Sequence, residues 1–373
     1  MAKIAFIEVT STVSYGGVQT AVWQLAIALH DMGHEITVIG GEGQIRADLG
    51  GRNITVHTFP FRSREKVIDL GTRFRKLAER LSFARNARKH VAEAGYDWVI
   101  LAKPFDFFWP WILPSNRKPK FAFLSEGTDF FLGDRFLGKK IDAWLACSHF
   151  NGWQIKSRYK RYPAVIFNGV DTTRFVPMAP DQDLRSSLGV APDETLFAFA
   201  GRLVGWKGLS VAIDALSQPM LDKMPVKLLI IGNGPQRREL EQMVRQKNLS
   251  QRVIFHGPVP HHELPRYYSA ADVGVFPSTA DEAFGITIAE AMGCGRPVIG
   301  SYIGGIPEVV GNEGNCGLLF SPGNAVELAQ SMHVLASSPE LREAMGKAAR
   351  DRVASLYTWE LSAKRMLMEM TKK

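Results

Sequence analysis

The stretch Pro277-Ser-Thr-Ala-Asp-Glu-Ala-Phe-Gly-Ile-Thr-Ile-Ala-Glu-Ala-Met-Gly-Cys-Gly-Arg-Pro297 holds the change from strand to helix that decides the fold class. The apolar run Asp272-Val-Gly-Val-Phe276 precedes it and predicts a buried parallel strand. A loop follows, and its glycines predict a helix that begins near Phe284-Gly285 and ends at Gly293 or Gly295. A strand that leads through a loop into a helix is the repeating unit of α/β proteins with parallel sheets.

The same alternation of strand and helix occupies both halves of the chain. In the first half it predicts strands at 3–9, 35–39, 54–59, 98–102, 121–124 and 143–146. In the second half it predicts strands at 195–200, 226–231, 253–255, 272–276, 297–301 and 317–320, separated by helices. Alternation over two halves predicts an α/β protein with two doubly wound, Rossmann-like domains that face each other across a cleft.

Composition favours an intracellular protein of two domains. A chain of 373 residues that is 46% hydrophobic is long enough for two cores. Three cysteines without a Cys-x-x-Cys pair argue against a disulfide framework or a zinc site and for a reducing cytoplasm. No signal-peptide pattern and no apolar run of about 18 residues is present, so we expect no membrane-spanning helix. Nothing in the motifs points to nucleic acid.

Two carboxylates frame the start of the helix predicted after Phe276. Glu282 lies in the loop and Glu290 lies eight residues later, about two turns into the helix. A loop carboxylate can bind sugar hydroxyls, the amides at a helix start can bind an anion, and Glu290 can reach a second diol such as a ribose. A solvated pair of carboxylates is the ordinary alternative, but the surrounding glycines and proline favour a site for a sugar nucleotide.

The spacing Glu282-x(7)-Glu290, with Phe284-Gly285 inside it and Pro297 after it, resembles the signature of retaining, nucleotide-sugar-dependent glycosyltransferases with the GT-B fold. The resemblance implies an acceptor-binding domain at 1–168 and a nucleotide-sugar-binding domain at 169–356. It also implies that a last helix, 357–373, crosses back to the first domain. The implied enzyme is a hexosyltransferase that moves a sugar from a UDP- or GDP-linked donor to an acceptor hydroxyl, without a metal or another cofactor.

When no metal is used, fixed cations and amides must stabilise the negative charge that grows on the leaving diphosphate. Arg202 and Lys207 lie five residues apart in a loop between strand and helix, and they match the family's phosphate-binding pair. We predict that Arg202, Lys207 and Glu282 are catalytic. The expected donor-binding residues are Gly16, Gly17, Gly232, Asn233, Gly234, His256, Gly257, Phe284, Gly285, Ile286 and Glu290.

One segment departs from the family pattern. Where the family commonly carries His-Gly-x-Asp, this chain has Glu126-Gly-Thr-Asp129. A carboxylate at position 126 would repel the donor diphosphate unless it faces sugar hydroxyls or an amine. We predict that Glu126 is a fourth catalytic residue, with donor contact, acceptor contact and a structural role as the three alternatives.

Positive charge is concentrated in the first half of the chain, where eleven Lys and Arg residues lie between Arg52 and His90. A solvated surface and a face that docks on anionic phospholipid, or on an anionic acceptor, are the two open interpretations. Docking would place the protein peripherally on the inner face of a membrane. The five aromatic residues between Pro104 and Pro114 are expected in the core, with a membrane wedge or an acceptor cleft as alternatives.

Metal and alternative functions receive less support. Asp181-Gln-Asp183 spells a metal-binding Asp-x-Asp, but its place before Leu184 predicts helix capping instead. The acceptor implied by the resemblance is a lipid-linked or cell-envelope glycan. The alternatives are a sugar-nucleotide-binding scaffold without catalysis, or an epimerase or phosphorylase of the same architecture.

Overall fold

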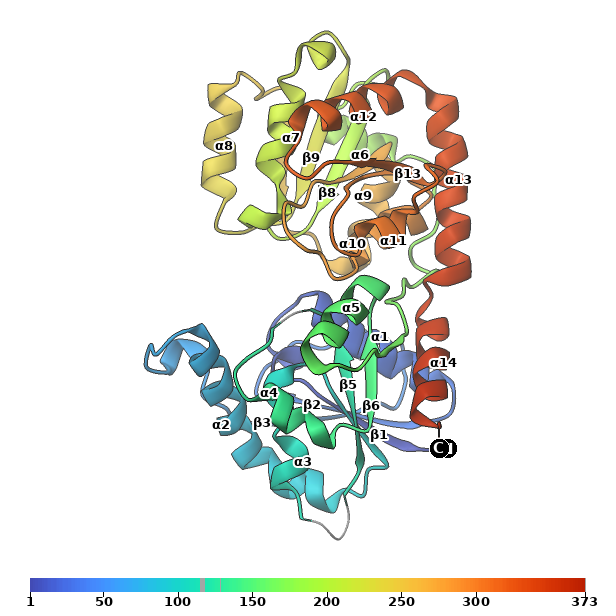
Figure 1. Ribbon diagram of the computed structural model, residues 1–373. Helices are drawn as coiled ribbons and strands as arrows, with labels where there is room; N and C mark the ends of the chain where they lie inside the picture. The colour runs from blue at the N-terminus through green and yellow to red at the C-terminus, as the bar shows by residue number, and fades with distance from the viewer. Residues whose placement is uncertain (115–117, 128, 373) are drawn as a thin grey trace. The chain divides into compact units, whose positions relative to one another are not determined.

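The structure is a computed structural model that describes residues 1–114, 118–127 and 129–372, so Thr128 of the Glu126–Asp129 segment lies outside the described residues. The chain divides into two compact units (Figure 1). The first unit comprises Met1–Gly169 and Trp359–Lys373, and the second comprises Val170–Thr358. Each unit has its own parallel sheet, and each is described by itself below.

The first unit is built on a seven-stranded parallel sheet in the order β3-β2-β1-β4-β5-β6-β7. Its strands are β1 (Lys3–Ile7), β2 (Glu35–Gly41), β3 (Thr55–Phe59), β4 (Trp98–Leu101), β5 (Lys120–Ser125), β6 (Ala143–Ala146) and β7 (Ala164–Val165). The sequence predicts the first six. It misses β7 because two residues are too few to show a periodicity.

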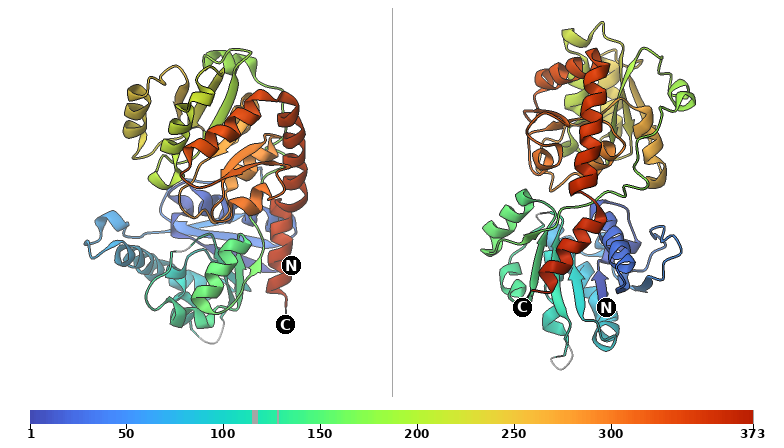
Figure 2. Two further views of the ribbon diagram at one scale, coloured as in Figure 1. Left: turned by 45° about the horizontal axis from the view of Figure 1, so that its top comes forward. Right: turned by 90° about the vertical axis from the view of Figure 1, so that its right-hand side faces the viewer.

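Helices surround this sheet. They are α1 (Gly17–Asp31), α2 (Thr72–Glu93), α3 (Trp109–Ile112), α4 (Asp134–Leu137), α5 (His149–Tyr159) and α14 (Trp359–Met370). Short 3₁₀ turns lie at η1 (Val9–Thr12), η2 (Arg64–Lys66), η3 (Pro104–Asp106) and η5 (Gly138–Lys140). The last helix, α14, packs beside α1, as the right-hand view in Figure 2 shows.

Alternate residues of the central strand face opposite sides of the sheet. Ala5 and Ile7 of β1 join the main buried cluster, which contains Phe83 and Ala87 of α2. Burial of these side chains supplies the hydrophobic driving force that holds α2 on this face, at roughly 25 cal/mol for each Å² of apolar surface removed from water.

Helix α2 differs from the sequence prediction in its start and in its buried face. The sequence pattern predicts a helix over about 65–94, with one apolar stripe formed by Leu70, Phe74, Leu77, Leu81 and Ala84. The helix instead begins at Thr72, because Gly71 with φ of 96° breaks the helical backbone there. The predicted apolar stripe is largely wrong. Leu70, Phe74 and Leu81 are exposed, Leu77 is half-buried and only Ala84 is buried. The helix is rotated so that Phe83, Ala87 and Val91 meet the sheet instead.

The aromatic segment between Pro104 and Pro114 is mainly core, as the sequence predicts. Its buried members are Phe105, Phe107, Phe108 and Trp109. Trp111 instead lies at the surface, where its ring stacks on Phe136 with centroids 4.9 Å apart. The Nζ of Lys140 lies 3.7 Å from the centre of the Trp111 ring, a cation–π contact.

The second unit is built on a six-stranded parallel sheet in the order β10-β9-β8-β11-β12-β13. Its strands are β8 (Thr195–Ala200), β9 (Val226–Ile231), β10 (Val253–Gly257), β11 (Val273–Phe276), β12 (Val298–Ser301) and β13 (Gly317–Phe320). All six strands lie where the alternation predicts them, with ends shifted by at most two residues.

The helices of the second unit follow the strands in turn. They are α6 (Gln182–Ser187), α7 (Leu209–Leu216), α8 (Arg237–Gln246), α9 (Leu264–Ala270), α10 (Ile286–Gly293), α11 (Ile306–Val310), α12 (Ala325–Ser337) and α13 (Pro339–Leu356). Short 3₁₀ turns lie at η6 (Gly205–Lys207), η7 (Pro219–Leu221) and η8 (His261–Glu263). Asp181 caps α6 by accepting a hydrogen bond from the Leu184 amide at 2.8 Å, which confirms its predicted capping role.

Candidate active site

Both sheets reverse the direction of their strand order once, and the second unit does so between β8 and β11. Ligands of open α/β sheets bind outside the carboxyl ends of the strands at such a reversal. The loop after β8 carries Arg202 and Lys207, and the loop after β11 carries Glu282. The topology therefore brings together three residues that the sequence predicts as catalytic.

Lys207 and Glu282 are in direct contact. The Nζ of Lys207 donates a hydrogen bond to Glu282 Oε2, and both side chains are largely buried. Lys207 also lies 4.4 Å from the centre of the Trp206 ring. Arg202 is exposed, and its side chain makes no hydrogen bond or ion pair with another described residue. The Lys207 ammonium is thus paired within the site, whereas the Arg202 guanidinium faces solvent.

Two glycines hold the loops of this site at close range. Gly208, with φ of 68°, has no room for a side chain, since a Cβ would lie 1.9 Å from the Pro277 carbonyl oxygen. Gly304, with φ of 62°, supports Glu282 in the same way, because its Cβ would lie 2.4 Å from the Glu282 carbonyl oxygen. The positions of Lys207 and Glu282 therefore depend on backbone packing that only glycine permits.

Helix α10 begins at the same edge of the sheet. Gly285 forms its N-cap in the left-handed conformation, and no side chain caps the helix start. Phe284 is buried, which fixes the chain just before the first helical residue, Ile286. Uncapped amides at a helix start are available to an anion. The predicted helix and its start are confirmed, while the role of the amides stays a prediction.

Glu290 lies on α10 but is not a free carboxylate. It is only 3% exposed, and its Oε1 lies 2.6 Å from His261 Nε2. Its Oε2 is shielded from solvent and has no hydrogen-bond partner among the described residues. Burial is the largest single influence on the pKa of His261 and lowers it, but the negative charge of Glu290 and the hydrogen bond to it together raise the pKa above its ordinary value. Sequence reasoning missed His261, because no spacing rule links it to a glutamate 29 residues later.

The residues predicted to bind the nucleotide base also lie together. The Gly232 amide donates to the Gly257 carbonyl at 2.7 Å, which joins the start of the loop after β9 to the last residue of β10. Asn233 is exposed, and its side-chain oxygen accepts from the Gly234 amide at 2.9 Å. His256 is exposed, with Nε2 2.9 Å from the Tyr267 hydroxyl.

The predicted residues of the first unit lie at its own reversal point or beside it. Gly16 precedes α1, and Gly17 is its first residue, in the connection that follows β1. Glu126 follows β5, the neighbour of β4. One of its oxygens, Oε2, accepts from Asn168 Nδ2 at 2.6 Å, and the other is enclosed without a partner among the described residues. Burial raises the pKa of Glu126 to about 8, although the Asn168 hydrogen bond and the charge of Lys103 oppose this rise.

A buried charge cluster beneath this edge is absent from the sequence prediction. Arg80 of α2 reaches Glu8 after β1, with Nη2 2.9 Å from Oε1, and it donates its other nitrogen to Asp106. All three side chains are almost completely buried. Burial raises the pKa of Asp106, and its Oδ1 has no partner within the described residues.

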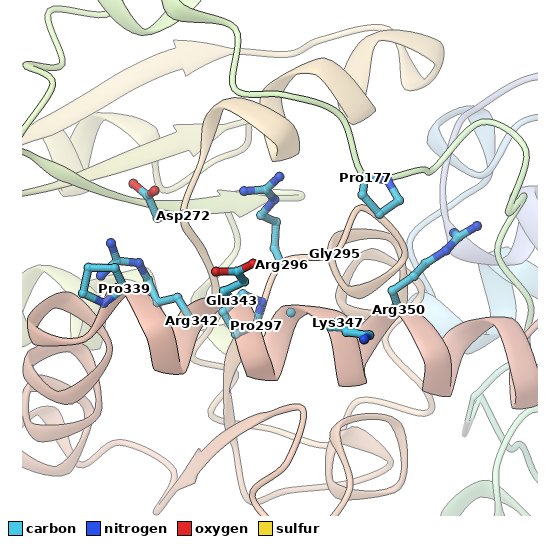
Figure 3. Close-up of a pocket in the computed structure, with 11 residues that line it drawn as sticks. Pro177, Asp272, Gly295, Arg296, Pro297, Pro339, Arg342, Glu343, Lys347 and Arg350 are labelled. Carbon is cyan, nitrogen blue, oxygen red and sulfur yellow. The ribbon is translucent and has the colours of Figure 1, made fainter.

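The cavity drawn in Figure 3 is not the candidate active site. It has a volume of about 470 Å³ and includes Asp272 and Pro297, which precede β11 and β12, so it lies at the opposite edge of the second sheet. Its arginines bind backbone carbonyls. Arg296 reaches Ala271 and Met178, and Arg350 reaches Phe175 and Gly293. The candidate site therefore lies at the loops of the carboxyl edge and not in this cavity.

Among the described residues, no group of three or more His, Cys, Asp and Glu side chains is placed to hold a metal ion. None of the described helices combines the length and the apolar character needed to cross a bilayer. His34 and His149 make local contacts, to the Ala2 amide at 3.2 Å and to the Tyr162 hydroxyl at 2.9 Å.

Comparison with curated proteins finds partial matches. An uncharacterized glycosyltransferase of Methanocaldococcus jannaschii is 34% identical over 221 residues, which are 58% of this chain and 54% of that protein. A GDP-mannose-dependent monoacylated alpha-(1-6)-phosphatidylinositol monomannoside mannosyltransferase of Corynebacterium glutamicum is 29% identical over 242 residues, 62% of each chain. The chain spans about half the length of the curated relatives it matches.

Solved structures match the whole fold. A sucrose-phosphate synthase from Thermosynechococcus elongatus is 25% identical, with a TM-score of 0.81 over 99% of this chain and 98% of that chain. Anabaena HepE in complex with UDP and glucose is 22% identical, with a TM-score of 0.82 over 100% of both chains. At 22% identity, the match to Anabaena HepE shows a shared fold only.

Two family models match consecutive parts of the sequence. The model described as Glycosyltransferase Family 4 matches residues 15–174, and the model described as Glycosyl transferases group 1 matches residues 180–352. Together they cover the body of both units. With the end-to-end similarity of fold, they show that the chain belongs to the group 1 and family 4 glycosyltransferases, a family with the GT-B fold.

Proposed function

We propose that this protein transfers a hexosyl group from a nucleoside diphosphate sugar to an acceptor hydroxyl, with retention of the anomeric configuration. The observation that supports it best is the convergence of Arg202, Lys207 and Glu282 at the strand-order reversal of the second sheet. Two cations and a carboxylate at that edge suit the two ends of such a donor, its diphosphate and its sugar.

The proposed chemistry assigns a separate task to each group. Negative charge grows on the diphosphate as the bond to the anomeric carbon breaks, and preorganised cations stabilise it. Arg202 binds phosphate oxygens through two donors, and Lys207 acts as a point charge. Glu282, released from Lys207 by the incoming phosphate, accepts hydrogen bonds from sugar hydroxyls. The acceptor hydroxyl attacks from the leaving-group face and passes its proton to a phosphate oxygen, so no protein base is required.

The donor nucleotide is proposed to be UDP or GDP. The Anabaena structure holds UDP and glucose, and the Corynebacterium relative is named for GDP-mannose. The loops at Gly232–Gly234 and His256–Gly257 of this chain are proposed to receive the base, since they join at the same edge of the sheet. The acceptor is proposed to be a lipid-linked or cell-envelope glycan.

A lipid-linked acceptor is supported by the surface of the segment 52–90. Large apolar residues are exposed in α2 and in the segment just before it: Ile68, Leu70, Phe74 and Leu81. Exposed cations accompany them: Arg62, Lys66, Arg73, Arg85, Arg88 and Lys89. Apolar side chains that enter the headgroup region, next to cations that meet phosphates, are the two components of peripheral binding to an anionic membrane.

Vesicle sedimentation tests the membrane contact. We expect the protein to pellet with anionic vesicles at low salt and to be released at high salt, with each nearby cation contributing about 1 kcal/mol. Neutral vesicles are the control. Protein that stays in the supernatant with anionic vesicles at low salt would show that this face is only solvated surface.

Donor turnover tests the enzymatic proposal. Purified protein is incubated with UDP- and GDP-sugars and with saccharide acceptors, and released nucleotide and product are followed by NMR. We expect release of the nucleoside diphosphate and a product with the anomeric configuration of the donor. Inverted product would contradict retention. Donor binding without any turnover would favour the scaffold alternative over the enzyme.

A further inference from the structure

Glu290 is a buried carboxyl group in which one oxygen has a hydrogen-bond partner and the other has none among the described residues. His261 contacts Oε1 at 2.6 Å, whereas Oε2 is enclosed and has no partner within the described residues. An enclosed polar oxygen without a partner is costly, because nothing replaces the water it has lost. A ligand that brings a hydroxyl donor to Oε2 would remove that cost.

The neighbours of Glu290 show from which side a ligand reaches it. Burial and the charge of Glu290 raise the pKa values of Tyr268 and Cys294, and both side chains are fully buried. His261 differs from these two neighbours, since 38% of its side chain is exposed. Of these three neighbours, His261 is therefore the one on the side of Glu290 that is open to solvent.

His261 is itself held in place within the second unit. Its ring packs on Phe175 with centroids 5.3 Å apart. The charged groups that face it are Glu290 from α10, and Arg174 and Asp171 from the segment before α6. Arg174 opposes the protonated imidazole, while Asp171 and Glu290 favour it. The two carboxylates thus favour a positive charge on the imidazole beside Glu290.

We infer that His261 is a positioning residue for the nucleotide: it holds Glu290 Oε1 and thereby presents Oε2 to a ribose hydroxyl. The inference rests on the proposed function, which supplies the nucleotide. A charged donor holds a carboxylate more firmly than a neutral one does, by roughly twofold in hydrogen-bond strength. Ribose recognition should therefore weaken as the pH rises and His261 loses its proton.

The experiment measures binding of UDP and GDP, and of their 2′-deoxy and 3′-deoxy analogues, by calorimetry between pH 5.5 and 8.5. Wild-type protein is expected to prefer the ribonucleotide over one deoxy analogue, and this preference should decline with rising pH. His261→Gln should lower the preference by about fivefold at the acidic end, which corresponds to about 1 kcal/mol, and should remove its pH dependence. His262→Gln is the matched control, because the neighbouring His262 is exposed and pairs only with Glu263, at 3.7 Å.

The outcomes separate this inference from the function on which it rests. A His261→Gln protein with the wild-type preference and pH profile would overturn the inference and leave the proposed function standing. Wild-type protein that binds neither nucleotide would overturn the proposed function itself. A structural role alone predicts a lower melting temperature with an unchanged ribose preference. If His261→Gln fails to fold, His261→Asn is measured in the same way.

Discussion

The two sheet edges with predicted catalytic residues are built in different ways. In the second unit the loops are pinned by backbone packing, with Gly208 against Pro277 and Gly304 against Glu282. In the first unit the edge rests on buried charge, with Arg80 between Glu8 and Asp106. Backbone shape therefore determines the site edge of the second unit, and buried charge determines that of the first unit. Substitutions at the second unit's edge should therefore change activity or loop geometry. Substitutions in the Arg80 cluster of the first unit should change stability, and those at Glu126 should change both activity and the pH dependence of stability.

The largest expected effect is loss of the buried cation in the first unit. Arg80→Met keeps much of the side-chain volume but removes the buried cation that contacts both Glu8 and Asp106, and leaves only the charge of Lys103 to oppose theirs. Breaking a buried ion pair in this way costs about 3–5 kcal/mol in the free energy of unfolding. Chemical denaturation measures this loss of stability. Arg85→Met is the control, because Arg85 is exposed and lies on the same helix. Equal stability of the two variants would show that the cluster is not essential to the fold.

Loss of either proposed phosphate ligand comes next. Lys207→Ala or Arg202→Ala should reduce turnover by roughly a hundredfold, the typical loss for one charge-stabilising group. The exposed Lys223→Ala serves as the control in the same unit. Melting temperatures are recorded alongside. Near-normal turnover in a folded Lys207 or Arg202 variant removes that residue from the catalytic role.

Glu126 is expected to have an intermediate effect on activity. Glu126→Ala should cost about 1–3 kcal/mol through unpaired polar groups, or roughly tenfold to a hundredfold in rate, while Glu126→Gln keeps much of the geometry. If Glu126 contacts the donor, Glu126→Ala should slow both donor hydrolysis and transfer. If Glu126 contacts the acceptor, Glu126→Ala should raise the acceptor KM and leave hydrolysis unchanged. Unchanged kinetics in Glu126→Ala would contradict both functional roles.

Glu126 also makes stability depend on pH. Its folded-state pKa of about 8 lies above the ordinary value of 4.5, so the native state binds more protons between these two values. The contribution to stability is present below about pH 4.5 and is lost as the pH rises through about 8. We expect Glu126→Gln to flatten the decline of melting temperature over this window. A decline of the same steepness in the variant would show that Glu126 is not its source.

Gly304 offers the most specific test of the loop packing at the second unit's edge. Gly304→Ala must adopt a positive φ and also push against the Glu282 carbonyl, whereas Gly323→Ala meets only the positive φ, since nothing lies within 4 Å of its Cβ. The control should lose about 1–2 kcal/mol of stability. Gly304→Ala should lose more, and should lower turnover by displacing Glu282. Equal losses without a change in turnover would argue against this support of Glu282.

The sequence predicts the second unit better than the first for a physical reason. Glycines, the Glu282–Glu290 spacing and the Arg202–Lys207 pair lie within short segments, so local patterns reveal them. The Lys207–Glu282 contact joins residues 75 apart, and only the strand-order reversal brings them together.

In the first unit the decisive contacts are long-range. Arg80 contacts Glu8, which lies 72 residues earlier in the sequence, and no periodicity of the sequence predicts this contact. The apolar stripe through Leu70, Phe74 and Leu81 misleads for a related reason. Helical spacing shows that residues share a face, but it does not show whether that face meets the sheet or solvent.

The packing of α14 beside α1 has a consequence for synthesis of the protein. Trp359, Met366 and Met370 of α14 are buried in the first unit, yet every residue of Val170–Thr358 precedes them in the chain. A ribosome adds about 5–20 residues each second, so the second unit takes on the order of ten to forty seconds to translate. Throughout that interval the emerging first unit lacks its last helix and leaves apolar surface on α1 uncovered. This protein therefore has a built-in delay during which a chaperone, or misassembly with another nascent chain, can act on its first unit.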